Sequence, residues 1–134
     1  MRVTMFKERF KDLILAGKKC TTIRPRGKHR PQPGEARSLR VWTGRPYRSP
    51  QAVFATVVLR EVVDVEITED GPLVDGIQLT GMERNRFAWD DGFEAWEDLL
   101  EWFQAREERL PFEGYLLRWD PIQEQREALT RGGE

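Results

Sequence analysis

A short basic stretch near the start of the chain combines the residue types that nucleophilic catalysis requires. Within AGKKCTTIRPRGKHR (residues 16–30), Lys19 is followed by Thr22 and then by Arg24. A threonine hydroxyl is a weak nucleophile until a base takes its proton, and a lysine is such a base once burial or nearby cations lower its pKa. An acid from elsewhere in the chain would orient the lysine or protonate the leaving group. Because the spacing Lys-x-x-Thr-x-Arg is common by chance, two other interpretations stay open: a segment that binds nucleic acid, or a solvated loop.

The geometry of this stretch depends on a predicted strand. The β-branched residues within 20–24 are typical of a strand, which Pro25 then ends. Successive strand side chains face opposite ways, so Thr22 and Arg24 share one face while Ile23 turns to the core. Thr22 and Arg24 would then face a cleft or solvent. Lys19 stands just before the strand, near enough to lean toward Thr22.

The elements that must position these residues indicate an α+β fold. Helical spacing covers residues 6–17 and ends at Gly17, and further helices are predicted at 81–93 and 93–110. Strands are predicted at 36–42, 52–68 and 112–120, the second of them bending near residues 60–61, and 73–80 is a further strand or an irregular piece. Loops rich in Gly and Pro cover 25–35 and 43–51. Strands that do not alternate regularly with helices favour α+β, and short strands with such loops suit a small barrel or a curled sheet.

Length and composition indicate one cytoplasmic domain. The 134 residues fit a single domain over 1–121 with a polar tail at 122–134. The apolar runs are too short to span a bilayer, and the N-terminus lacks the apolar segment of a signal peptide. With one cysteine, Cys20, and one histidine, His29, we expect neither a disulfide framework nor a Cys/His zinc site. We therefore predict no metal, no cofactor and no membrane partner, and leave the oligomeric state open.

Charge is divided unevenly along the chain. Residues 1–48 carry 14 Lys/Arg against 3 Asp/Glu, a net charge of +11, whereas residues 49–134 carry 8 against 20, a net charge of −12. A basic half suggests a polyanionic partner; the alternative is that the two halves pair with each other on the surface. Trp42 and Tyr47 add to the first interpretation, because aromatic rings among arginines suit base stacking beside phosphate contacts. The arginines concerned are Arg40, Arg45 and Arg48.

Structural explanations compete with the functional ones. Lys18 and Lys19 would be favoured at the end of the first helix by its dipole. Asp90 and Asp91 would be favoured just before a helix for the same reason. Cys20 is more typical of a small buried hydrophobe than of a reactive thiol. Four tryptophans are predicted to belong to the core, namely Trp89, Trp96, Trp102 and Trp119.

Several segments resemble a known family. FKDLILAGKKCTTIR is similar to the N-terminal signature of ASCH domains in the PUA-like superfamily, a helix ending in Gly, then Lys, two residues, Thr, one residue and Arg. Gly17, Lys19, Thr22 and Arg24 match that order and spacing. PGEARSLRVW resembles the family's Gly-acid turn and strand, with an extra residue or two. WDDGFEAWEDLLEWF resembles an acid-Gly-Phe element that opens a helix, and EGYLLRWDP resembles the closing strand.

The resemblance implies a small PUA-like β-barrel with helices at its rim and a basic cleft for RNA or a nucleobase. Some bacterial members hydrolyse N4-acetylcytidine with a Thr nucleophile, a Lys that activates it and a Glu. Carried over, Thr22 would be the nucleophile, Lys19 its base and Arg24 a contact to substrate or oxyanion. The acid position falls at Asp91, next to Asp90, and is a departure because Asp is one methylene shorter than Glu.

Two functions of different classes follow. The first is a module that binds RNA or a modified nucleobase, and it ranks higher because it does not require an accurately placed acid. Its binding residues would be Lys18, Arg24, Arg26, Trp42, Arg45 and Tyr47. The alternative is an amidohydrolase with Lys19, Thr22 and Asp91 as catalytic residues. Ribonuclease activity, to which family members have also been linked, is a weaker third possibility, and a domain that pairs only with other proteins would leave the charge division unused.

Overall fold

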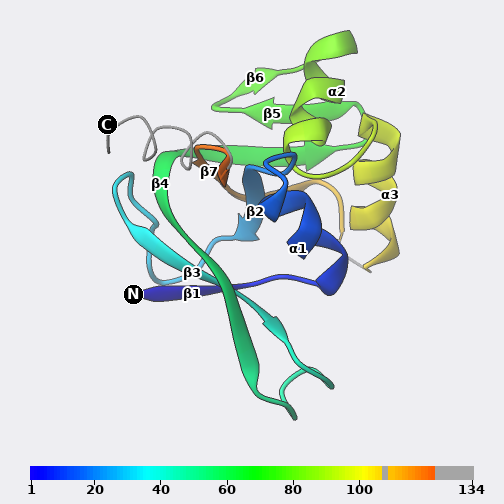
Figure 1. The fold of residues 1–134 in the computed structure, drawn as a ribbon. Helices are drawn as coiled ribbons and strands as arrows, with labels where there is room; N and C mark the ends of the chain where they lie inside the picture. Colours follow the sequence, from blue (N-terminus) through cyan, green and yellow to red (C-terminus); the bar gives the residue numbers. More distant parts are fainter. Residues whose placement is uncertain (107–108, 123–134) are drawn as a thin grey trace, which may run out of the picture.

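The computed structural model describes residues 1–106 and 109–122, which form a mixed sheet with three helices (Figure 1). The elements in chain order are β1 (Arg2–Met5), α1 (Glu8–Leu15), β2 (Thr21–Pro25), β3 (Ala36–Trp42), β4 (Gln51–Thr68), β5 (Gly71–Val74), β6 (Ile77–Gln78), α2 (Gly81–Asp90), α3 (Trp96–Ala105) and β7 (Phe112–Trp119). The predicted α+β class is confirmed. Of the predicted polar tail, the structure describes only Ile122, whose side chain is buried.

The long strand β4 pairs with three other strands and is central to the sheet. Its first half pairs with β3 and its second half pairs with β7 and β5, all antiparallel. The register shifts between Leu59 and Glu61, which confirms the predicted bend, because an extra residue at that point turns the strand and increases its twist. Figure 1 shows β4 curving along the whole molecule. One strand therefore holds together two parts of the sheet that face different ways.

The sheet is not closed into a barrel. β1 pairs with β3 and β2 pairs with β7, but no backbone ladder joins β1 to β2 within residues 1–106 and 109–122. A side chain bridges these two elements instead, because the Arg24 Nη2 donates to the Met5 carbonyl oxygen at 2.7 Å. The barrel implied by the family resemblance is thus not confirmed.

The helices follow the predicted pattern with shifted ends. Helix α1 buries Phe10 and Ile14 and is followed by Gly17 at φ 78°, as expected for a glycine stop. Asp90 and Asp91 end α2 rather than begin the next helix, so the prediction that they precede a helix is wrong. α3 starts only at Trp96, where the Asn85 Oδ1 of α2 accepts a hydrogen bond from the Trp96 N–H. None of the described helices is long and apolar enough to cross a membrane.

The core contains two of the four tryptophans predicted for it. Trp96 and Trp119 are fully buried, whereas Trp102 is half-buried. Trp89 is 47% exposed, so its assignment to the core is wrong. The reason is helical geometry: α2 buries Phe87 and Ala88, and the next position along the helix turns toward solvent.

Candidate functional site

One cavity gathers most of the residues that the sequence singled out. It has a volume of about 360 Å³ and lies between the segment joining β1 to α1, strand β2, the end of β3, and helix α3. Six of the nine predicted site residues line it: Lys19, Thr22, Arg24, Trp42, Tyr47 and Asp91. Sequence reasoning missed most of its aromatic wall, which consists of Phe6, Phe10, Phe93, Trp102, Phe103 and Phe112.

A buried ion pair lies at the base of the site. The Lys19 Nζ donates to the Asp91 Oδ1 at 3.1 Å and to the Asp91 carbonyl oxygen at 2.6 Å. The side chains of Lys19 and Asp91 are almost fully buried, and the ammonium also lies over the Phe10 ring, 4.7 Å from its centroid. Lys19 is therefore not a solvated helix cap, and the pair is strongly shielded from water.

Burial brings the pKa values of Lys19 and Asp91 closer together. Desolvation lowers the pKa of Lys19, although the neighbouring Asp91 carboxylate opposes the shift. Desolvation raises the pKa of Asp91, against the opposing influence of Lys19. Because both shifts disfavour the charged forms, moving the proton from the lysine to the carboxylate requires less free energy than in water. Desolvation thus shifts the pKa of Lys19 in the direction that a general base requires.

The hydroxyl next to this pair belongs to Thr21. Its Oγ1 donates to the Asp91 Oδ1 at 3.1 Å, whereas the Thr22 Oγ1 accepts a hydrogen bond from the Arg24 Nε at 2.9 Å. No hydrogen bond joins Lys19 to Thr22 in the described part of the chain. Lys19 and Thr21 thus share the Asp91 Oδ1 as hydrogen-bond acceptor, a contact that depends on where α2 ends in space and that the sequence prediction did not include.

Arg24 combines a structural and a cavity-facing role. Besides bridging to the Met5 carbonyl oxygen, its guanidinium lies over the Phe6 ring at 4.8 Å. Desolvation lowers the pKa of Arg24 to about 10, so the group remains a cation at neutral pH. The hydrogen bond between Thr22 and Arg24 agrees with the prediction that they share one strand face. Ile23, predicted to turn to the core, is half-buried and also lines the cavity.

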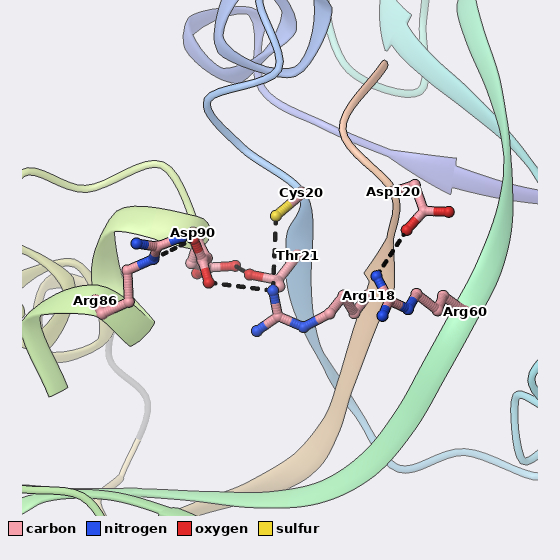
Figure 2. Close-up of polar contacts among 8 residues, drawn as sticks. Cys20, Thr21, Arg60, Arg86, Asp90, Arg118 and Asp120 are labelled. Carbon is pink, nitrogen blue, oxygen red and sulfur yellow. Dashed lines mark hydrogen bonds and ion pairs between the residues drawn. The ribbon is translucent and has the colours of Figure 1, made fainter. Parts of the chain in front are cut away.

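Asp90 clamps the end of α2 against the strands beneath it. Figure 2 shows Arg118 of β7 reaching Asp90 and Cys20, with Arg86 approaching Asp90 along α2. The Asp90 Oδ2 lies 3.1 Å from the Arg118 Nη1, and the Asp90 carbonyl oxygen accepts a hydrogen bond from the Cys20 N–H at 2.8 Å. These contacts fix the backbone at the position from which Asp91 meets Lys19. Cys20 itself is buried, as expected of a small hydrophobe.

Gly92 allows the ion pair to form at this position. Its φ of 96° is in the left-handed region, where residues with a Cβ are strained. A Cβ there would lie 3.1 Å from the Lys19 Cδ and 3.3 Å from the Phe10 Cδ1. Each residue of the acid-Gly-Phe element therefore contributes to the site. Asp91 pairs with Lys19, Gly92 leaves space for the Lys19 side chain, and Phe93 lines the cavity.

The remaining predicted residues are divided between the opening and the outer surface. Tyr47 is 89% exposed and its ring centroid lies 5.2 Å from that of Trp42, so this aromatic pair stands at the opening. Lys18, Arg26 and Arg45 are exposed and do not line the cavity. Arg26 lies 3.5 Å from Asp64, an acid of the other half, so part of the charge division is balanced by pairing between halves.

No known family model and no curated protein sequence matches the chain. Among solved structures, the chain is similar to ZmASCH from Zymomonas mobilis, crystallised as a mutant protein. The similarity covers 88% of this chain and 67% of that chain, with a TM-score of 0.50 and 14% sequence identity. At this identity the likeness concerns the fold alone. The chain therefore has an ASCH-like fold.

Proposed function

We propose that this domain binds a nucleobase, in RNA or in a modified nucleoside, within the cavity between β2, the end of β3 and α3. The observation that carries the proposal is the lining of the cavity. Aromatic rings make up much of its wall, and cations of Lys7, Arg24 and Arg106 stand among them. Its volume of about 360 Å³ falls in the range of small-molecule pockets. Such a wall suits a nucleobase, which is a flat, polar ring that carries or lies next to negative charge.

The aromatic pair at the opening supports entry of an unstacked base. Trp42 and Tyr47 come from the end of β3 and the loop after it. Their rings are tilted by 49° to each other, and Tyr47 holds its position with φ at 63°. Exposed aromatic rings beside arginines are what single-stranded nucleic acid uses for stacking. A base that leaves its stack would meet this pair before it reaches Lys19 and Asp91.

Fluorescence anisotropy with a short labelled single-stranded RNA tests the binding function. We expect binding that weakens with added salt, and a roughly fivefold or larger loss in Trp42→Ala, since stacking contributes about 1–3 kcal/mol per base. Trp89→Ala is the matched control, because Trp89 is exposed on α2 and does not line the cavity. Equal losses in the two variants, or no RNA binding at low salt, would contradict the proposal.

A second candidate, deacetylation of N4-acetylcytidine, is favoured by the buried pair of Lys19 and Asp91. In this reaction the Thr22 Oγ attacks the acetyl carbonyl, and Lys19, in its neutral form, takes the hydroxyl proton. The C–N bond breaks as that proton passes to N4 of cytidine, and water then releases acetate from the acyl-threonine. Arg24, which already contacts the Thr22 Oγ1, would stabilise the developing oxyanion. Asp91 would orient Lys19.

Incubation with N4-acetylcytidine tests this candidate. Thr22→Val is expected to abolish cytidine release. Thr21→Val is its matched control on the same strand and is expected to reduce release without abolishing it, because Thr21 contacts Asp91 rather than Arg24. If Thr21→Val abolishes turnover and Thr22→Val does not, the assignment of the nucleophile is wrong. Absence of turnover at high enzyme concentration would remove the hydrolase for this substrate and leave the binding function.

A further inference from the structure

The cavity contains more positive charge than its own acid can balance. Among the residues that the structure describes, four cations line it, namely Lys7, Lys19, Arg24 and Arg106, with Asp91 as the one acid. Lys19 is paired with Asp91. Lys7 and Arg106 form no ion pair with a carboxylate within residues 1–106 and 109–122. Arg24 is attracted by the Asp91 carboxylate but forms no direct ion pair with it. By contrast, Arg26 and Arg30 outside the cavity both lie against Asp64.

Lys7 and Arg106 both approach the Trp102 ring, although they flank different helices. Lys7 precedes α1 and Arg106 follows α3. The Lys7 Nζ lies 4.9 Å and the Arg106 Cζ 5.1 Å from the centroid of the Trp102 ring. Both side chains are exposed, so they are free to reach a ligand at the surface of the cavity. An aromatic surface next to cations is suited to a stacked ring with an attached anion.

The third cation, Arg24, is less exposed than Lys7 and Arg106, and one of its nitrogens is available to donate a hydrogen bond. The Arg24 Nε donates to Thr22 and its Nη2 donates to Met5. Its Nη1 makes no hydrogen bond to the described residues, although the side chain lines the cavity. A guanidinium that is fixed by two hydrogen bonds loses little further entropy when it binds an oxyanion through the remaining nitrogen.

We infer that the cavity recognises a phosphate group together with the base, so that its ligand is a nucleotide, free or within RNA, rather than a neutral nucleoside. The phosphate oxygens would be held by Lys7, Arg24 and Arg106 while the base lies against the aromatic wall. This inference rests on the proposed function and narrows it. For the hydrolase candidate, it means that an acetylated cytidine nucleotide is preferred over the nucleoside.

Calorimetric titration with matched ligands tests this inference. The ligands are the four common ribonucleosides and N4-acetylcytidine, each with its 5′-monophosphate, with inorganic phosphate alone and a short single-stranded RNA as the other arms. We expect the best nucleotide to bind at least tenfold more tightly than its nucleoside. The double variant K7Q/R106Q should remove most of that difference, whereas R60Q should not, because Arg60 is paired with Asp120 and does not line the cavity.

The outcomes separate this inference from the function on which it rests. Equal affinity for nucleoside and nucleotide would overturn phosphate recognition and leave nucleobase binding intact. Inorganic phosphate binding as tightly as the nucleotides would also overturn it, because the base would then contribute nothing. If neither nucleosides, nucleotides nor RNA bind, the proposed function itself fails. Tight RNA binding with weak mononucleotide binding, both lost in K7Q/R106Q, would support the inference with RNA as the source of the phosphate.

Discussion

At the scale of single residues, the contact between Lys19 and Asp91 joins the end of α2 to the segment just before β2. The Lys19 Nζ reaches both the carboxylate and the backbone carbonyl oxygen of Asp91. The end of α2 therefore approaches the lysine so closely that a longer side chain is not required. Because the pair is buried, removing either partner would leave the other charge in the interior without its counter-charge.

Replacing Asp91 by Asn is expected to destabilise the fold substantially. The substitution leaves Lys19 buried without its counter-charge, and breaking such a pair costs about 3–5 kcal/mol. Asp64→Asn is the control, because Asp64 pairs with exposed arginines and a surface pair contributes about 0–1 kcal/mol. Urea denaturation of both variants gives the two free energies of unfolding. Similar losses would mean that Lys19 finds another partner or loses its proton.

Cys20 is expected to be an unreactive thiol. Burial raises the pKa of Cys20 above its ordinary value, so little thiolate forms in the folded chain. At pH 9, iodoacetamide should therefore modify the folded protein far more slowly than the denatured protein. The sign for stability follows: the unfolded thiol loses its proton first, so this group lowers the stability as the pH rises through 9. Equal rates of modification would contradict the burial of Cys20.

At the scale of elements, the sequence predicted what local patterns determine. Strand β2, the bend in β4 and the Gly17 stop depend on β-branched residues, register and glycine, all of which are local properties. The contact of Thr21 with Asp91 depends on where α2 ends in space, which no pattern within β2 encodes. The open sheet likewise depends on the pairing of distant strands. Trp89 was misplaced because aromatic character alone does not tell which helix face is buried.

Gly92→Ala tests the turn that joins α2 to α3. Gly92 and Gly34 both have positive φ, 96° and 89°, so an alanine at either position incurs a backbone cost of about 1–2 kcal/mol. An added Cβ meets nothing within 4 Å at Gly34, whereas at Gly92 it meets Lys19 and Phe10. Denaturation should therefore show a clearly larger loss for Gly92→Ala than for Gly34→Ala. Equal losses would mean that the lysine stem is not held against this turn.

At the scale of the whole molecule, the excess positive charge of residues 1–48 lies in two kinds of surroundings. Part of it is balanced between the halves, as in the contacts of Asp64 with Arg26 and Arg30. Another part lies around the cavity, where Lys7, Arg24 and Arg106 form no ion pair with a carboxylate of residues 1–106 and 109–122. The sequence indicated the division of charge but not which cations would be paired, because pairing depends on the fold. Exposed cations outside the cavity remain candidates for contacts to a longer RNA.

The triple variant K18Q/R26Q/R45Q separates these outer cations from the cavity. These residues are exposed and none lines the cavity. Each phosphate contact contributes about 0.7 to the slope of log K against log salt for a single strand. The triple variant should therefore weaken binding of a longer RNA and flatten that slope by about 2, with binding of a mononucleotide unchanged. An unaltered slope would show that RNA does not follow this surface.

The most direct test of where the ligand binds uses the five tryptophans as separate reporters. Trp42 and Trp102 line the cavity, whereas Trp89 is exposed elsewhere and Trp96 and Trp119 are core residues. In a ¹⁵N-correlated NMR spectrum with each indole N–H assigned by substitution, titration with RNA or a nucleotide should shift the Trp42 and Trp102 signals. The other three should stay in place. Shifts confined to Trp89, or no indole shift under conditions where binding is measured independently, would contradict binding in the cavity.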